Sequence, residues 1–204
     1  MSYSQIKSSL RLSKSTLSLW LRNYPLSKNQ INSLRANNLK RIEKFRETMR
    51  LKRENRLKET YKLQKQSLLP LSRKELFISG LFLYWGEGSK TTSQININNT
   101  DPQMLEFALF WLNKILLVPT SKIKVYLHLY KDMDINKENL FWSKVLKINH
   151  SKFLKPYIKQ SLRSNLTHKG FGHGTCCLIV NNVLLKEKIM MSISAIADHY
   201  SENS

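Results

Sequence analysis

Cysteine is nearly absent from this sequence, and its scarcity argues against a zinc site. The 204 residues include two cysteines, the neighbours Cys176 and Cys177. Adjacent residues of a strand point to opposite faces, so the two thiols would not chelate one metal ion. The sequence also has no C-x-x-C pair. We therefore expect no zinc, with one thiol buried and the other facing outward in a reducing compartment.

Long apolar runs are also missing. The longest, residues 76–85, is far shorter than the roughly 20 residues that a membrane-spanning helix needs. The residues near the start lack the apolar stretch that a secretory signal needs. These absences predict a cytoplasmic protein that has no membrane partner.

Acidic residues are scarce, and this shortage points to a polyanionic partner. The chain has 34 Lys and Arg against 14 Asp and Glu, a net charge of +20. Such a surplus repels itself unless a polyanion neutralises it, and nucleic acid is the commonest partner of this kind. Residues 1–75 carry 19 basic and 5 acidic residues, whereas residues 76–204 carry 15 and 9. We expect the first third to be the electrostatic footprint, with a domain boundary near residue 70.

Residues 3–22 have the spacing of two short helices. Apolar residues recur at helical intervals on both sides of Ser13, which is well placed to cap the second helix. Short polar and basic side chains lie off the apolar face of this second helix. In the major groove they would contact bases and phosphates, and they are Lys14, Ser15, Thr16, Ser18 and Arg22.

This stretch resembles the helix-turn-helix of resolvases and related regulators, in which Ser-Lys-Ser-Thr is followed by an apolar residue and a Trp-Leu pair. The resemblance implies that residues 1–26 form a DNA-binding module. Arg11 stands in the turn where that family usually has glycine, so we expect a left-handed backbone there. An ordinary helical hairpin that binds nothing is the alternative.

A stretch without glycine or proline follows, from residue 27 to residue 69. Ser27 and Gln30 have the spacing of a capping box, which predicts the start of a helix. We expect one long basic helix over residues 27–70. It either lies along the DNA backbone or is a solvated linker, because charge runs are often only solvated faces.

A second capping box, Ser72 with Glu75, predicts the start of another helix. It continues through an apolar run to Trp85, which predicts a helix buried on all sides. Gly86-Glu87-Gly88 ends it. A carboxylate gains nothing from a helix C-terminus, so the position of Glu87 suits metal binding better than structural support.

Strand and helix patterns alternate over residues 94–200. Period-two alternation predicts strands at 94–98 and 122–130, a proline favours an edge strand at 155–159, and 174–181 has the pattern of a buried strand. We expect an α+β fold in which helices cover one face of an antiparallel sheet. The other face is either simply solvated or suited to a DNA groove. Its candidate DNA contacts are Gln94, Asn96, Asn98, Lys122, Lys124, Tyr126 and His128.

Residues 72–200, within an expected domain of residues 71–204, resemble the LAGLIDADG homing endonucleases. The resemblance rests on the buried helix ending in Gly86-Glu87-Gly88-Ser89, followed by strands and helices on one sheet. It implies a single-motif member, which forms a homodimer with its motif helices at the two-fold axis. Glu87 and its symmetry mate would then hold Mg²⁺ or another divalent cation, and a metal-activated water would cut each strand. The expected dimer interface is Ser79, Gly80, Leu83 and Gly86.

Basic residues around Glu87 and in a later loop complete the candidate site. Lys90 and Lys124 either stabilise phosphate charge during cleavage, as catalytic residues, or only contact DNA. A glycine-rich loop at 160–175 adds candidate backbone contacts, of which His173 is also a less favoured general base. The contacts in this loop are Arg163, His168, Lys169 and His173.

Two classes of function stay open after this reading. One is a sequence-specific, metal-dependent endonuclease of double-stranded DNA. The other is a non-catalytic, DNA-binding transcriptional regulator on a LAGLIDADG scaffold. Structured RNA is not excluded as the ligand, because the positive charge suits it equally.

Overall fold

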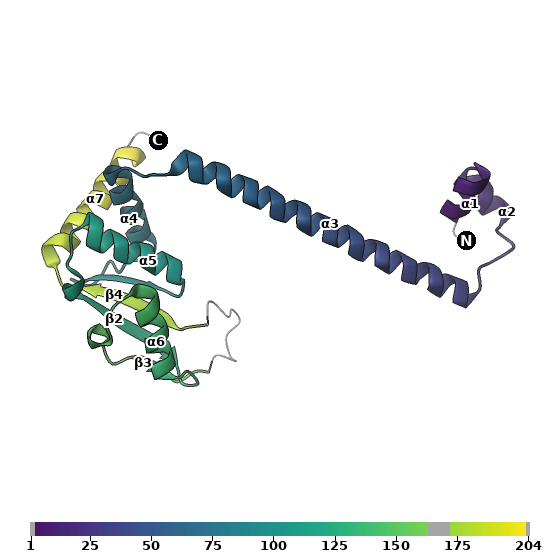
Figure 1. Cartoon of the computed structure of the whole chain (residues 1–204). Helices are drawn as coiled ribbons and strands as arrows, with labels where there is room; N and C mark the ends of the chain where they lie inside the picture. Colours follow the sequence, from purple (N-terminus) through teal and green to yellow (C-terminus); the bar gives the residue numbers. More distant parts are fainter. Residues whose placement is uncertain (1–2, 163–171, 203–204) are drawn as a thin grey trace. The chain divides into compact units, whose positions relative to one another are not determined.

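The computed structural model describes residues 3–162 and 172–202. The chain divides into two compact units, Met1–Leu69 and Pro70–Ser204. The fold is α+β, as the alternation of sequence patterns predicted (Figure 1). Within the described ranges, no helix combines the length and the apolar character needed to cross a membrane.

In the first unit, α1 (Tyr3–Leu10) and α2 (Lys14–Trp20) pack against each other as a short hairpin. Ser13 caps α2, because its Oγ accepts a hydrogen bond from the Thr16 amide at 3.0 Å. Arg11 has a φ of 53°, which confirms the expected left-handed turn. Leu17 is the one buried residue among those described here, so the hairpin has a very small core.

Helix α3 (Lys28–Leu68) is continuous over 41 residues. Its capping box forms as expected: the Gln30 amide donates to Ser27 Oγ at 3.3 Å, and the Ser27 amide donates to Gln30 Oε1 at 2.9 Å. The side chains that the structure describes on α3 are exposed or half-buried. Its order therefore rests on capping and on local pairs such as Arg50 with Glu54 at 2.9 Å.

The described part of the second unit is built on a four-stranded sheet in the order β1-β4-β2-β3. The strands are β1 (Ile95–Asn99), β2 (Ile123–Tyr130), β3 (Tyr157–Lys159) and β4 (Thr175–Val180). β4 pairs antiparallel with β1 and β2, but β3 pairs parallel with β2. The sheet is therefore mixed rather than antiparallel as expected. A helix connects β2 to β3, and such a crossover brings the second strand back in the direction of the first.

Four helices cover one face of this sheet in the described chain: α4 (Arg73–Glu87), α5 (Pro102–Phe110), α6 (Ile135–Leu146) and α7 (Val183–Ser201) (Figure 1). The side chains that cap their first turns are Ser72, Asp101, Asp134 and Asn182. A π-helical turn, Trp111–Ile115, follows α5. Trp111 and Trp142 are fully buried and fill the space between the helices and the sheet.

Helix α4 is not buried on all sides, contrary to the expectation from its apolar sequence. One face packs inside the unit, where Gly80, Leu81 and Tyr84 are buried. Phe82 and Trp85 are 51% and 42% exposed, and their ring centroids lie 5.8 Å apart. The number of elements that surround a helix cannot be predicted from an apolar run alone. In this chain the packing covers only one side of α4.

The two cysteines also differ from expectation in one respect. Cys176 belongs to the core, whereas Cys177 pairs with Asn98 and Tyr126 on the other face. Both thiols are nevertheless buried, because a small side chain between taller neighbours is shielded from water. Burial raises the pKa of the Cys177 thiol to about 12, so it stays protonated near pH 7.

Candidate nucleic-acid interface

The face of the sheet opposite the helices carries polar side chains. Asn96 and Asn98 on β1, and Lys124, Tyr126 and His128 on β2, alternate with buried residues of the same strands. Five of the seven candidate contacts on the sheet are therefore on one face. None of the four strands contains Asp or Glu, so the strands contribute no carboxylate to it.

The other two candidates, Gln94 and Lys122, lie beside the strands rather than within them. β1 begins at Ile95 and β2 begins at Ile123. Lys122 ends a short 3-10 turn, Thr120–Lys122. Both expected strands began one residue too early, because a strand starts where its ladder hydrogen bonds start, and alternation does not mark that point.

The strand register sets the width of this polar face. Asn96 pairs with Ile179, which pairs in turn with Lys124; in the next row Cys177 lies between Asn98 and Tyr126. Because neighbouring strands lie about 4.8 Å apart, roughly 10 Å separate β1 from β2.

β3 extends the face in a way that the sequence analysis missed. Tyr157 pairs with His128, and Lys159 pairs with Tyr130. The His128 ring centroid lies 4.9 Å from that of Tyr126 and 5.6 Å from that of Tyr157. Lys159 Nζ lies 4.9 Å from the Tyr130 ring centroid. The period-two spacing of Tyr157 and Lys159 was visible in the sequence, but the strand beside which they lie was not.

The electrostatics of the face follow from its burial and its lysines. Burial lowers the pKa of His128 below its ordinary value of 6.5, and the Lys159 ammonium lowers it further. The imidazole is therefore neutral near pH 7. Lys124 is exposed, so its ammonium is free to contact a phosphate. The face thus has a neutral aromatic centre between two cationic side chains.

Glu87, the candidate metal ligand, is the exposed last residue of α4. The chain then turns tightly, because the Gly88 amide donates to the Tyr84 carbonyl oxygen at 2.8 Å. A Cβ on Gly88 would lie 2.6 Å from the Tyr84 ring, so a side chain does not fit there. The Ser89 amide donates to the Asn96 carbonyl oxygen at 2.9 Å. This turn docks the end of α4 on the edge of β1.

Lys186 on α7 holds the same turn from the inside, and the sequence analysis did not single it out. The residue is 5% exposed, and its Nζ donates to the Tyr84 hydroxyl at 2.5 Å and to the Ser89 carbonyl oxygen. The Tyr84 hydroxyl donates to that carbonyl oxygen at 2.7 Å. Burial and the Lys90 ammonium lower the pKa of Lys186. Its helical spacing from the buried residues of α7 was the available signal.

A single chain offers Glu87 little help in holding a metal ion. Within residues 3–162 and 172–202, no three His, Cys, Asp or Glu side chains gather where they could hold one. Mg²⁺ in proteins is often held by one or two carboxylates together with substrate phosphates. Among the described residues, Glu87 therefore does not belong to a metal site formed within one chain.

The two candidate catalytic lysines come from different parts of the unit. Lys90 is exposed just after the α4 turn, which docks on β1. Lys124 lies in the row of Asn96, with β4 between their strands. At about 4.8 Å for each strand spacing, the Asn96 and Lys124 backbones are roughly 10 Å apart. Lys124 is therefore not next to the turn that carries Glu87.

The residues expected at a dimer interface do not share one surface of α4. Gly80 is buried, and a Cβ on it would lie 2.0 Å from Trp111 Nε1. Gly86 is exposed, with nothing within 4 Å of a Cβ, whereas Ser79 and Leu83 are half-buried. Gly80 therefore belongs to the packing within the chain. The open side of α4 carries the exposed Phe and Trp rings instead.

In the first unit, the exposed candidate contacts are Lys14, Ser15, Ser18 and Arg22. Thr16 is half-buried, and its Oγ1 lies 2.7 Å from Ser13 Oγ. Ser15 Oγ also lies 2.7 Å from Ser13 Oγ, so both hydroxyls take part in the cap. Lys14 and Ser18 remain free of it, and Arg22 lies beyond the end of α2.

A carboxylate–imidazole pair joins Glu138 of α6 to His173, just before β4. Glu138 is 3% exposed, and its Oε2 lies 2.7 Å from His173 Nδ1. The His173 ring stacks on the Phe141 ring, with centroids 3.5 Å apart. The main-chain carbonyl oxygen of His173 accepts a hydrogen bond from Trp142 Nε1 at 2.9 Å. His173 is thus held firmly by α6. Glu138 was not among the residues expected from the sequence, and the other loop candidates, Arg163, His168 and Lys169, lie outside the described residues.

Known proteins add no further evidence about this site. Comparison of the chain with models of protein families, with curated proteins and with solved structures gives no match.

Proposed function

We propose that this protein binds double-stranded DNA in a sequence-specific manner. The observation that carries the proposal is the polar face of the sheet, whose strands contribute amides, lysine and aromatic side chains but no carboxylate. Asn side chains pair with adenine and Lys side chains with guanine in the major groove. On this face Asn98 would read a base and Lys124 would contact a base or a phosphate, whereas the side-chain oxygen of Asn96 is buried.

The first unit supports the same proposal by its charge and its exposed side chains. Lys14 and Ser18 are free to enter a groove when α2 is presented to DNA. Helix α3 carries 13 Lys and Arg against four Glu, so it would contribute phosphate contacts. A linker role for α3 remains the alternative, and the salt dependence of binding separates the two.

Selection from a randomised duplex library tests this proposal. An enriched motif is expected for the wild-type protein, and Asn98→Ala should relax the preference at one position, at about 1–3 kcal/mol per lost base contact. Lys124→Ala should reduce the slope of log affinity against log salt by about 0.9 if it contacts a phosphate. Lys137→Ala, an exposed lysine on the helix side, is the matched control. Absence of any enriched motif would contradict the proposal.

We also propose that the protein is a metal-dependent DNA endonuclease that acts as a homodimer. The support is the LAGLIDADG resemblance, the exposed carboxylate at the end of α4 and the open apolar side of α4, where Phe82 and Trp85 could meet a second copy. Dimerisation would supply the second Glu87 that a shared Mg²⁺ site needs. When bound, the ion would supply Lewis-acid chemistry at the scissile phosphate.

A non-catalytic transcriptional regulator is the second candidate, and the isolation of Glu87 favours it. Incubation of duplex DNA with Mg²⁺ or with chelator, followed by sequencing of cut ends, separates the two functions. For an endonuclease, Glu87→Gln should abolish cutting and leave binding intact, while Glu106→Gln, an exposed carboxylate on α5, should leave both unchanged. A bound motif without cut ends under any divalent metal would leave the regulator.

A further inference from the structure

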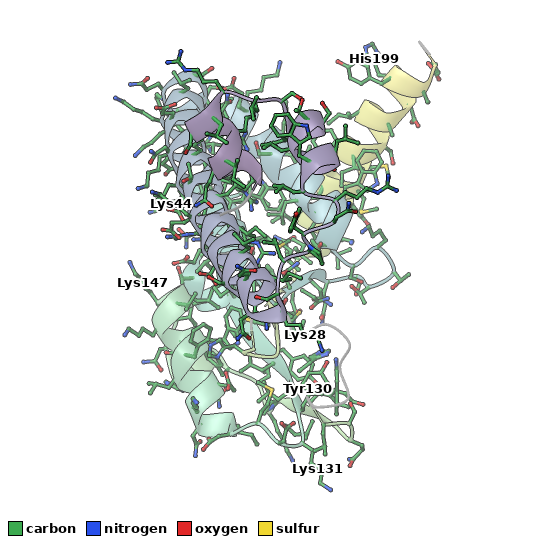
Figure 2. All side chains as sticks on the ribbon, turned by 90° about the vertical axis from the view of Figure 1, so that its right-hand side faces the viewer. Lys28, Lys44, Tyr130, Lys131, Lys147 and His199 are labelled. Atoms are coloured by element: carbon green, nitrogen blue, oxygen red, sulfur yellow. The ribbon has the colours of Figure 1, made fainter. Side chains whose placement is uncertain are left out.

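The β2–β3 side of the sheet carries an aromatic cluster, defined here as Tyr126, His128, Tyr130 and Tyr157. The residues occupy alternate positions of their strands, so they share the polar face. His128 meets Tyr126 and Tyr157 edge to face, at interplanar angles of 79° and 64°. Such contacts hold rings in fixed relative orientations. Figure 2 labels Tyr130, the last residue of β2, and Lys131, the residue that follows it.

Next to the aromatic cluster, the polar face carries shorter side chains. The register places Thr175 of β4 beside His128 and Cys177 beside Tyr126. Asn98 follows on β1, beyond Cys177. Thr, Cys and Asn side chains are short, whereas Tyr and His rings stand higher from a sheet. Side-chain size therefore changes across this face, from the rings of β2 and β3 to the shorter side chains of β4 and β1.

Three polar side chains of this surface have no hydrogen-bond partner among the described residues. Neither the Tyr126 and Tyr157 hydroxyls nor the Asn98 amide forms a hydrogen bond with another described residue. Lys124 is exposed on one side, and Lys159 lies over the Tyr130 ring on the other. A ligand with flat rings, polar edges and negative charge matches this surface.

We propose that the aromatic cluster is a stacking platform for unpaired bases of single-stranded nucleic acid. In a duplex both faces of each base are covered by its neighbours, so a protein ring cannot stack on them. An unpaired base exposes its faces, and aromatic side chains bind such faces with little regard to sequence. The Asn98 amide would meet the edge of the base, and Lys124 and Lys159 would meet phosphates.

This inference goes beyond the proposed function and does not depend on it. Duplex binding would use the amides and lysines of the sheet together with α2. Single-strand binding would use the rings of β2 and β3. Asn98 and Lys124 would serve both activities, whereas the rings of β2 and β3 would serve only single-strand binding, so substitution of a ring separates the two.

Binding of the full-length protein to a fluorescent thymidine oligonucleotide, and to a duplex of the same length, tests the platform. Tyr157 is 53% exposed, so Tyr157→Ala should fold normally, which thermal unfolding checks. We expect it to weaken single-strand binding about tenfold, and duplex binding by less than about twofold. Tyr157→Phe keeps the ring and should bind the single strand within about twofold of wild type. Phe110→Ala, which removes an exposed ring on the helix side, should change neither affinity.

Photo-crosslinking with a bromouracil oligonucleotide gives a second readout that a purely structural role would not move. The crosslinked peptides should contain residues 126–130 or 157. A matching uridine oligonucleotide distinguishes RNA from DNA as the source of the bases. No wild-type binding to either single strand, an equal loss in Tyr157→Phe and Tyr157→Ala, or equal losses for single strand and duplex would each overturn the proposal.

Discussion

Gly80 lies against the indole of Trp111 so closely that a Cβ on residue 80 would be 2.0 Å from Nε1. Trp111 is fully buried and belongs to the main core of the second unit. This contact lets α4 approach the helical layer at close range. Because α4 packs through this side, its opposite side faces outward, and the apolar residues there, Phe82 and Trp85, stay exposed.

Gly80→Ala should therefore destabilise the second unit. The added methyl group would force the indole or the helix to move, which costs about 1–3 kcal/mol in a packed core. Gly86→Ala on the same helix is the control, because nothing lies within 4 Å of its Cβ and alanine favours helix by up to about 1 kcal/mol. Urea unfolding of the two variants measures the difference. Equal stability of both would contradict the packing argument.

The Glu138–His173 pair should show strong energetic coupling. Removing either partner leaves a polar group at least partly buried without its hydrogen bond, so each alanine variant should lose about 1–3 kcal/mol. The double variant should lose clearly less than the sum of the single losses. Glu138→Gln can still accept from the imidazole and should lose less than Glu138→Ala. Additive losses in a double-mutant cycle would exclude the coupling.

Stability should fall in alkaline solution, in part because of Cys177. Burial raises the pKa of this thiol from 9.0 to about 12 in the folded chain. Above pH 9.0 the unfolded chain loses this proton first, so the contribution is complete below that pH and is lost as pH rises toward 12. The free energy of unfolding falls by roughly 1 kcal/mol for each pH unit above the pKa of this thiol in the unfolded chain.

Comparison of wild type with Cys177→Ala removes this thiol together with its electrostatic effect on Tyr84, whose pKa burial raises to about 12. Guanidinium unfolding on both sides of pH 9.0 is the measurement. The variant should lose less stability than wild type over that interval. Identical pH dependence in the two proteins would show that Cys177 is not shielded as described.

Lys147→Gly should stabilise the second unit. Lys147 ends α6 with a φ of 53°, a left-handed conformation that disfavours residues with a Cβ (labelled in Figure 2). Glycine removes this penalty at the cost of more freedom in the unfolded chain, for a net gain of about 0.5–1 kcal/mol. Lys147→Ala removes the same charge but keeps the Cβ, so it should show no such gain in thermal unfolding. A gain in both variants would assign the effect to charge.

Features that depend on neighbours in the sequence were predictable here. The capping boxes at Ser27 and Ser72, the left-handed Arg11 and the proline-limited edge strand could all be predicted before the fold was known. Each depends on a few consecutive residues and their backbone angles. Features that depend on distant residues were not predictable. The pairing of β3 with β2, the buried Lys186 and the Glu138–His173 contact join segments that no local pattern relates.

The candidate site divides in the same way. Alternation along β2 placed Lys124, Tyr126 and His128 on one face, because strand geometry fixes that face for any partner. Tyr157 and Lys159 lie beside these residues because β3 pairs in parallel with β2. That pairing depends on the whole sheet and not on the sequence of either strand.

By itself, the sequence determined the charge of this protein, the ends of most helices and the alternating faces of its strands, since short-range geometry governs all three. The tertiary structure decided which apolar surfaces are covered. Helix α4 has apolar residues around most of its circumference, yet only the side that carries Gly80 and Tyr84 meets the core. Burial depends on the number and position of neighbours, and only the assembled fold supplies them.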